Sequence, residues 1–152
     1  DSGRIDQQDT ILSEMEVRIK RILSIESSRR IETPLAVIIG KCDMWLQLLK
    51  KPLLDTIEGG KLNLSAVDAN SQTLREFLLE IDPSIVSNAE SISTNVKYFA
   101  LSALGHSPMV IQEGANIGKI APIPEKLNPI NVEIPSIWAL SQTSDLIPTM
   151  RE

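Results

Sequence analysis

The segment Pro-Leu-Ala-Val-Ile-Ile-Gly-Lys-Cys-Asp-Met-Trp, residues 34–45, decides the fold of this chain. It opens with five consecutive apolar residues at 35–39, three of them β-branched, between a proline and a glycine. A short apolar run bounded in this way is typical of a strand buried on both faces of a parallel sheet. Lys41 and Asp43 follow directly, at the end of the strand where open α/β sheets bind their ligands. The segment therefore predicts a parallel strand with a candidate site at its carboxyl end.

The composition limits the class of protein. The 152 residues are enough for one domain, and 42% apolar with 23% charged residues is ordinary globular composition. A net charge of −5 with only 3% aromatic residues argues against a nucleic-acid partner. Cys42 and His106 are the only cysteine and histidine, so neither an intrachain disulfide nor a zinc-site spacing is expected. No apolar run approaches the ~20 residues of a membrane span, and we expect a cytoplasmic setting.

The rest of the chain alternates helical and extended patterns. Apolar residues recur every three or four positions over residues 6–30, which predicts a long amphipathic helix that packs its apolar stripe on a sheet. Asp82 and Pro83 form a helix start in which the aspartate is the cap. The fold class expected is therefore α/β, with parallel strands flanked by helices. The further elements predicted are a helical segment at 44–51, helices at 63–79 and 83–92, a strand at 96–101, a long loop at 107–131 and a closing helix at 132–147.

The turns that follow the two predicted strands resemble motifs of P-loop GTPases. Gly-Lys-Cys-Asp at 40–43 is similar to that family's guanine-reading motif, which is usually Asn or Thr followed by Lys-x-Asp. Ser-Ala-Leu at 102–104 resembles its second base-contacting turn. The first helix and the runs at 74–78 and 98–105 are most similar to bacterial GTPase-like domains of the double-GTPase type. The resemblance implies that residues 1–152 form the C-terminal part of a three-layer GTPase-like fold.

The chemistry of these turns suits a guanine base. A carboxylate such as that of Asp43 can accept hydrogen bonds from both N1–H and the 2-amino group of guanine, a pattern that adenine cannot supply. The aliphatic stem of Lys41 can lie over the flat base. The backbone N–H of Ala103 can donate to the guanine O6, in a turn that Ser102 and Leu104 shape. The resemblance thus implies GTP or GDP as ligand and these five residues as its nucleotide-binding set.

The departures from the family pattern matter as much. Gly40 replaces the Asn or Thr that ties the base-reading turn to the phosphate loop. No Gly-x-x-x-x-Gly-Lys-Ser/Thr occurs, and no Asp-x-x-Gly follows a strand, so the groups that hold the phosphates and Mg²⁺ are missing. We therefore expect no hydrolysis by this chain alone. Because the first residue is Asp1 and not methionine, we also expect the chain to be a piece of a longer protein.

Two alternatives remain open. The chain is either a base-reading part of a GTPase-like domain or a non-catalytic interaction module that kept the fold and lost the nucleotide. In both cases the strand at 35–39 needs a neighbour, supplied by the upstream part of the same protein or by another subunit, because an open apolar edge is a pairing liability. At the level of single residues, Lys41 and Asp43 also fit a solvated pair at a strand end, and Ser102 also fits a turn cap.

Overall fold

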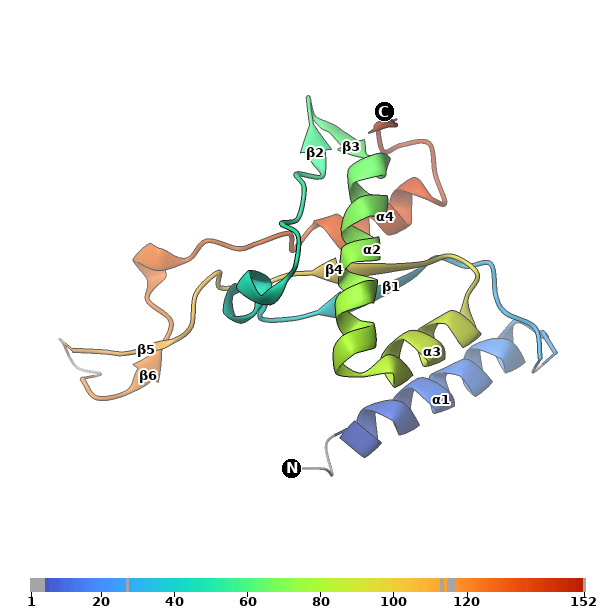
Figure 1. Ribbon diagram of the computed structural model, residues 1–152, viewed down its shortest axis with the longest axis horizontal. Coiled ribbons are helices and arrows are strands. Elements are labelled where there is room, and N and C mark those ends of the chain that lie inside the picture. The colour runs from blue at the N-terminus through green and yellow to red at the C-terminus, as the bar shows by residue number, and fades with distance from the viewer. Residues whose placement is uncertain (1–4, 27, 113, 115–116, 152) are drawn as a thin grey trace.

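Two parallel strands form the centre of the structure. The computed structural model describes residues 5–26, 28–112, 114 and 117–151, and in it β1 (Leu35–Ile39) pairs in parallel with β4 (Val96–Ala100). Both strands lie where the apolar runs predict them, β4 ending one residue earlier than expected. Within these residues the chain is a mixed α/β structure with four α-helices and small parallel or mixed sheets (Figure 1).

The connection between these strands contains two helices that begin at side-chain caps. In α2 (Leu64–Ile81) the side chain of Asn63 accepts the backbone N–H three residues on, at 3.1 Å. In α3 (Pro83–Ile92) the carboxylate of Asp82 accepts the N–H of Ser84 at 3.0 Å, which confirms the predicted cap. Asp82 has extended backbone angles, φ −152° and ψ 91°, so it separates the two helices. The two helices, separated at Asp82, therefore belong to the crossover connection that parallel strands such as β1 and β4 require.

Alternation along β4 places the core on both faces of the strand pair. Tyr98 and Ala100 lie in one buried cluster, which α2 and α3 cover. Phe99 points the opposite way, as the two-residue period of a strand requires, and packs on Trp138 of α4 (Ile134–Ser141) with ring centroids 5.5 Å apart. The first cluster contains Cys42, Leu74, Leu78, Val86, Tyr98 and Ala100, and the second contains Leu62, Val67, Phe99, Ile134 and Trp138.

The first helix differs from the prediction in length and in packing. α1 spans Ile5–Ile22 and ends well before residue 30, because Ser24 has the left-handed φ of 53° that a right-handed helix cannot contain. It packs on α3, not on a sheet. Ile11, Met15 and Ile22 remain 57%, 43% and 80% exposed. The expectation that this stripe packs on a sheet is therefore wrong for these residues, because α1 packs on α3 and leaves them exposed.

Smaller elements surround this centre. The polar stretch after residue 51 forms a hairpin, whose Gly59 and Gly60 have φ of 55° and 73° as a tight turn requires. Residues 107–131, expected as a long loop, carry a second hairpin that projects from the body in Figure 1. The closing helix is α4, shorter than the predicted 132–147. These elements are β2 (Ile57–Glu58), β3 (Lys61–Asn63), β5 (Met109–Val110), β6 (Ile120–Ala121), β7 (Thr149–Met150) and short 3₁₀ turns at Cys42–Met44, Leu46–Leu48 and Pro124–Lys126.

One ion-pair cluster joins α2, α3 and β4. The guanidinium of Arg75 donates to both carboxylate oxygens of Glu90, at 2.5 and 3.0 Å. The hydroxyl of Tyr98 donates to the same carboxylate at 3.3 Å. The Arg75 hydrogen bonds lower the pKa of Glu90, while burial and then the charge of Glu90 raise the pKa of Tyr98. The cluster holds three elements together and its hydrogen bonds involve none of the predicted site residues, so we interpret it as structural.

Candidate functional site

The predicted site residues lie in two turns at one edge of the strand pair. The backbone N–H of Leu101 donates to the carbonyl of Ile39 at 3.1 Å, and that of Cys42 donates to the carbonyl of Leu101 at 3.1 Å. The hydrogen-bonded ladder thus continues past the ends of both strands. Because the strands are parallel, the turns at 40–43 and 102–104 emerge side by side from the same edge.

The first turn exposes its two charged side chains. Lys41 adopts the left-handed conformation, with φ 53° and ψ 40°, and starts a short 3₁₀ turn. Lys41 is exposed and Asp43 is half-buried. Within the described part of the chain, neither side chain makes a hydrogen bond or an ion pair. A strained backbone at a lysine, followed by an unengaged carboxylate, is an arrangement found at functional sites.

The residues between and after this pair anchor the turn. Cys42 is fully buried in the core cluster, where burial, and next the charge of Asp43, raise the pKa of its thiol. A thiol in such a place stays protonated and unreactive. The indole Nε1 of Trp45 donates to the carbonyl of Gly40 at 2.9 Å, and its ring stacks on Phe77 with centroids 5.3 Å apart. The turn is therefore held from beneath by packing, while its outer side faces solvent.

Gly40, the main departure from the family motif, lies in open space. A Cβ added at this position would meet no atom within 4 Å. The backbone φ is not in the left-handed region, so no glycine is required there. The backbone geometry therefore tolerates a larger side chain, and glycine at this position has no steric cause in the described residues.

Ser102 serves as a turn cap. Its side chain is 3% exposed, and its hydroxyl accepts the backbone N–H of Gly105 at 2.9 Å. Its own backbone exchanges two hydrogen bonds with Ile130, at 3.1 and 2.8 Å. No base contacts the hydroxyl among the described residues, so the geometry does not favour Ser102 as a nucleophile.

The second turn presents a backbone donor at Ala103. Ala103 is exposed, and its N–H has no acceptor in the described part of the chain. The carbonyl of Leu104 accepts from the backbone N–H of Asn128 at 3.0 Å. This bond ties the turn to the segment that follows the β5–β6 hairpin, which we call the hairpin arm. At Gly105, with φ 71°, an added Cβ would lie 1.8 Å from the Asn128 carbonyl oxygen. Close approach of the two backbones thus fixes the turn that displays the Ala103 N–H.

Two further polar residues lie near these turns and were not predicted as site residues. Asn131 has a left-handed φ of 53°, and its side-chain amide donates to the carbonyl of Ala100 at 3.4 Å. Asparagine tolerates this conformation better than most residues, and it precedes the start of α4, which is the only signal that its sequence position offers. His106 contacts the carbonyl of Ser107 through Nδ1 at 2.8 Å, while its buried Nε2 has no partner among the described residues.

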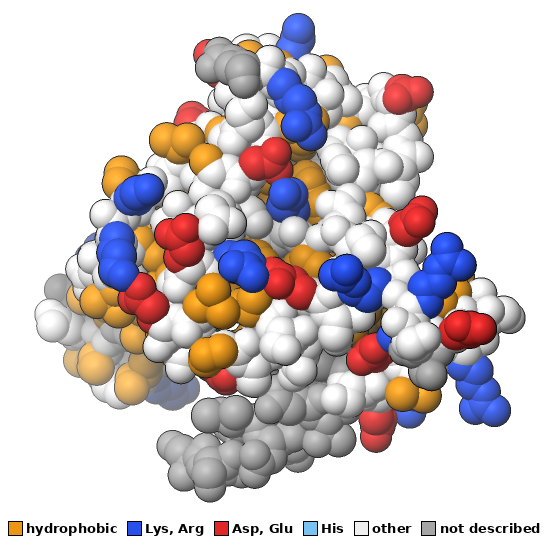
Figure 2. All heavy atoms as spheres, turned by 45° about the vertical axis from the view of Figure 1, so that its right-hand side comes forward, with side chains coloured by type: hydrophobic (Ala, Val, Ile, Leu, Met, Phe, Trp, Pro, Cys, Tyr) orange, Lys and Arg blue, Asp and Glu red, His pale blue; other side chains and the backbone are white. Residues whose placement is uncertain are grey.

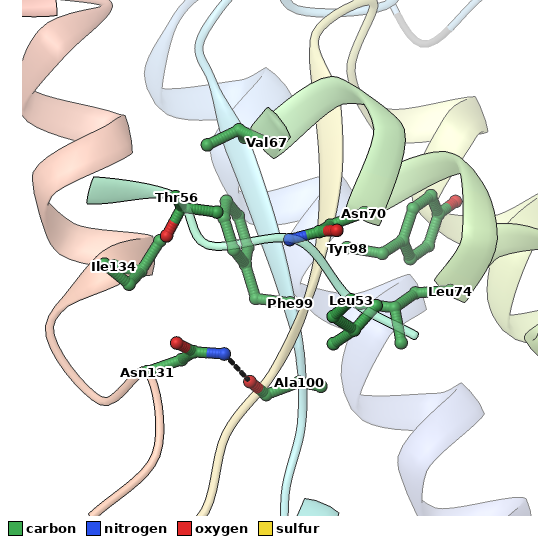
Figure 3. Close-up of a pocket in the computed structure, with 10 residues that line it drawn as sticks. All are labelled: Leu53, Thr56, Val67, Asn70, Leu74, Tyr98, Phe99, Ala100, Asn131 and Ile134. Atoms are coloured by element: carbon green, nitrogen blue, oxygen red, sulfur yellow. Dashed lines mark hydrogen bonds between the residues drawn. The ribbon is translucent and has the colours of Figure 1, made fainter. Parts of the chain in front are cut away.

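A small cavity lies in the core, with Ala100 and Asn131 among the residues that line it. It is enclosed by α2, β4 and the start of α4, and Figure 3 shows the side chains of Thr56, Asn70 and Asn131 around it. Its free volume of about 20 Å³ has room for one water. Asn70 already exchanges hydrogen bonds of 2.7 and 2.9 Å with the backbone of Leu54. The cavity is too small for a nucleotide, so any ligand of the turns must bind on the open edge.

Charged side chains of both signs are mixed on one face of the molecule. Figure 2 shows Lys and Arg side chains interspersed with Asp and Glu, and small apolar areas between them, over the face that it displays. Among the described residues, no three His, Cys, Asp or Glu side chains are grouped as metal ligands. No helix within those residues has the length and apolar character needed to cross a bilayer.

Comparison with known proteins adds no relative. No protein-family model, no curated protein and no solved structure matches this chain. The functional argument therefore depends on the geometry of the two turns.

Proposed function

We propose that the two turns read a guanine base as the C-terminal part of a three-layer GTPase-like domain. One observation carries the proposal: the unengaged carboxylate of Asp43 and the unengaged N–H of Ala103 extend from adjacent parallel strands at the same edge. The carboxylate of Asp43 can accept from the N1–H and 2-amino groups of guanine, and the N–H of Ala103 can donate to its O6. Lys41 covers the base, Ser102 fixes the turn through Gly105, and Leu104 anchors it.

The chain alone supplies base contacts and no phosphate contacts. Charge-assisted bonds to phosphate are the strong ones in nucleotide sites, and the chain has no phosphate-loop motif to make them. We therefore expect affinities in the millimolar range, which correspond to about −4 kcal/mol of binding free energy. GTP or GDP would bind tightly, with Mg²⁺, only when an upstream half supplies the phosphate loop. Hydrolysis is then a property of that half.

The test titrates GMP, AMP and XMP into the chain and follows backbone amide resonances by NMR. The proposal predicts that GMP shifts the amides of Lys41, Asp43 and Ala103, and that AMP at equal concentration does not. Equal shifts with both purines would contradict base reading. The three ligands are all monophosphates, so their phosphate contacts are similar. Differences between their responses therefore report the contacts of the base.

Asp43→Asn is the decisive variant. An amide keeps one acceptor oxygen and replaces the other with an NH2 donor, so it no longer accepts from the 2-amino group of guanine but can donate to the 2-oxo group of xanthine. GMP binding should therefore weaken about tenfold or more while XMP gains affinity. Asp145→Asn is the matched control, since Asp145 is exposed and lies after α4. A GMP profile that Asp43→Asn leaves unchanged would reject the proposal.

The alternative function is a non-catalytic interaction module without a nucleotide. It is favoured by Gly40, which lacks the tethering side chain, and by the exposed hairpin arm, in which Met109, Val110 and Ile120 are 47%, 55% and 74% exposed. Absence of any GMP response in the NMR titration would favour this alternative. The fold would then serve to present surfaces to other proteins.

A further inference from the structure

The outer edge of β1 carries backbone groups without partners. Residues of a parallel strand point their N–H and C=O groups alternately to its two edges. Leu35 donates to the segment that leads into β4, and Ile39 accepts from the residue that follows β4, so the odd-numbered residues of β1 face β4. The N–H and C=O groups of Ala36 and Ile38 face away, and no described residue binds them.

The opposite edge of the strand pair is partly covered. There the hydroxyl of Ser71 accepts the N–H of Tyr98 at 3.0 Å, and the amide of Asn131 donates to the carbonyl of Ala100. The backbone of Ser102 pairs with Ile130 on the same side. Side chains and a bridging segment thus bind the β4 edge at Tyr98, Ala100 and Ser102, whereas no described residue binds the β1 edge. The β1 edge is therefore the more open of the two.

The composition of β1 is not that of a natural sheet edge. Proteins protect edge strands with charged residues, prolines or bulges, and residues 35–39 contain none of these. Ile38 is 53% exposed on the face that Phe99 and α4 share, although its neighbours are half-buried. An apolar strand of this kind belongs inside a sheet.

The helices beside the strand pair contact one another through α3. α2 contacts β4 and α3, α3 shares a core cluster with Val37 of β1, and α1 packs on the far side of α3 (Figure 1). α1 therefore lies outermost and carries an exposed apolar row of Ile11, Met15 and Ile22.

We propose that this edge binds one parallel strand, apolar on both faces, from outside residues 1–152. The strand continues the β1–β4 ladder by bonding to Ala36 and Ile38. Its side chains on one face contact the α1 row, and those on the other face contact Ile38. The proposal goes beyond the guanine site and does not depend on it, because the strand binds along β1 and not at the turns.

A second copy of the chain fits this edge less well. Each copy covers its own β1 with α3, so α1 of the first copy meets a helix where it needs a bare strand face. A lone strand satisfies both the ladder and the helix face.

The test adds a soluble strand peptide, acetyl-Lys-Val-Thr-Ile-Val-Val-Lys-amide, to the chain and measures amide hydrogen exchange by NMR. Without peptide, Val37 and Ile39 should be protected, while Ala36 and Ile38 exchange fast. With millimolar peptide, we expect exchange at Ala36 and Ile38 to slow by about fivefold or more. A nitroxide on the peptide's N-terminus should broaden the resonances near Leu35, and one on its C-terminus those near Gly40.

Two matched variants distinguish strand addition from nonspecific binding of the peptide. Ile38→Lys places a charge at the edge and should abolish the protection, whereas Ile120→Lys, at an exposed isoleucine of the hairpin arm, should not. The proposal would be overturned if the nitroxide pattern were reversed or if saturating peptide gave no protection. It would also be overturned if protection rose with protein concentration in the absence of peptide. GMP responses of the turns are unaffected by any of these outcomes, so the two proposals fail separately.

Discussion

The hydroxyl of Ser71, on α2, accepts the backbone N–H of Tyr98, on β4, at 3.0 Å. Both groups are buried, and the bond occupies the strand edge at which a further strand would otherwise pair. One helix side chain thus ends the sheet on this side and leaves growth to the β1 side. The relationship also sets the distance between α2 and the strand that it covers.

Ser71→Ala should lower the free energy of unfolding by about 1–3 kcal/mol, because it leaves a buried N–H without an acceptor. Urea unfolding followed by far-ultraviolet circular dichroism measures this change. Ser87→Ala, at an exposed position of α3, is the control and should change stability by less than about 0.5 kcal/mol. Equal effects of the two variants would show that the Ser71–Tyr98 bond contributes nothing.

Glu90 should make the fold sensitive to acid. Arg75 lowers the pKa of Glu90 in the folded state below its ordinary value of 4.5. The stabilisation is therefore complete above pH 4.5 and is lost as the pH falls through the lower folded pKa. Both side chains are about one-third exposed, so solvent screening limits the effect to about 1 kcal/mol. Urea midpoints of Glu90→Gln should depend less on pH between about 5 and 3 than those of the unchanged chain.

Tyr98 should make the fold sensitive to alkali. Burial and the Glu90 carboxylate raise the pKa of Tyr98 above its ordinary value of 10.0. Stability is then unaffected below pH 10 and falls by up to about 1.4 kcal/mol per pH unit above it, until the folded pKa is reached. Tyr98 is the only tyrosine, so phenolate absorbance reports its ionisation directly. Ionisation near pH 10 in the folded chain, or an alkaline loss that Tyr98→Phe does not reduce, would contradict this assignment.

Gly105→Ala should disrupt the second turn. The new methyl group would overlap the Asn128 carbonyl oxygen, so we expect a loss of more than about 2 kcal/mol in unfolding free energy. Gly118→Ala is the matched control: its φ is 84° but its Cβ position is open, so it should cost only the backbone strain of about 1 kcal/mol. Similar losses in both variants would mean that left-handed strain alone, not the close approach, decides the turn.

Gly40→Asn should leave the fold intact, because a Cβ there meets no atom within 4 Å. We expect a change in unfolding free energy within about 0.5 kcal/mol, measured by urea. If the base-reading proposal holds, the added amide gains a partner only when a phosphate loop is present, so GMP binding to the chain alone should not improve. A marked loss of stability would show that the turn needs glycine for a reason other than space.

Local patterns in the sequence were sufficient for the two central strands and for most helix starts. The run at 35–39 and the Asp82 cap predict β1 and the start of α3, because apolar continuity and capping act between near neighbours in the chain. The end of α1 was not predictable in this way. Ser24 carries no residue-type signal for a left-handed φ, and the apolar pattern continues past it.

The candidate residues themselves came from the sequence, while their arrangement came from the fold. Lys41, Asp43 and Ala103 follow apolar runs that the sequence displays, but only the parallel pairing of β1 with β4 brings their turns to one edge. The cap formed by Ser102 was among the alternatives that the sequence left open, whereas Asn131 depends on a backbone position that no spacing encodes.

The sequence by itself determined where β1 and β4 lie, where most helices begin, and which residues can supply a carboxylate, a cation and a small turn. Only the tertiary structure decided that Ser71 binds the β4 edge while the β1 edge is open, and that the apolar row of α1 lies exposed. The physical reason is that propensity and capping act over a few residues. Strand pairing and burial instead join groups far apart in the chain, such as Ser71 and Tyr98.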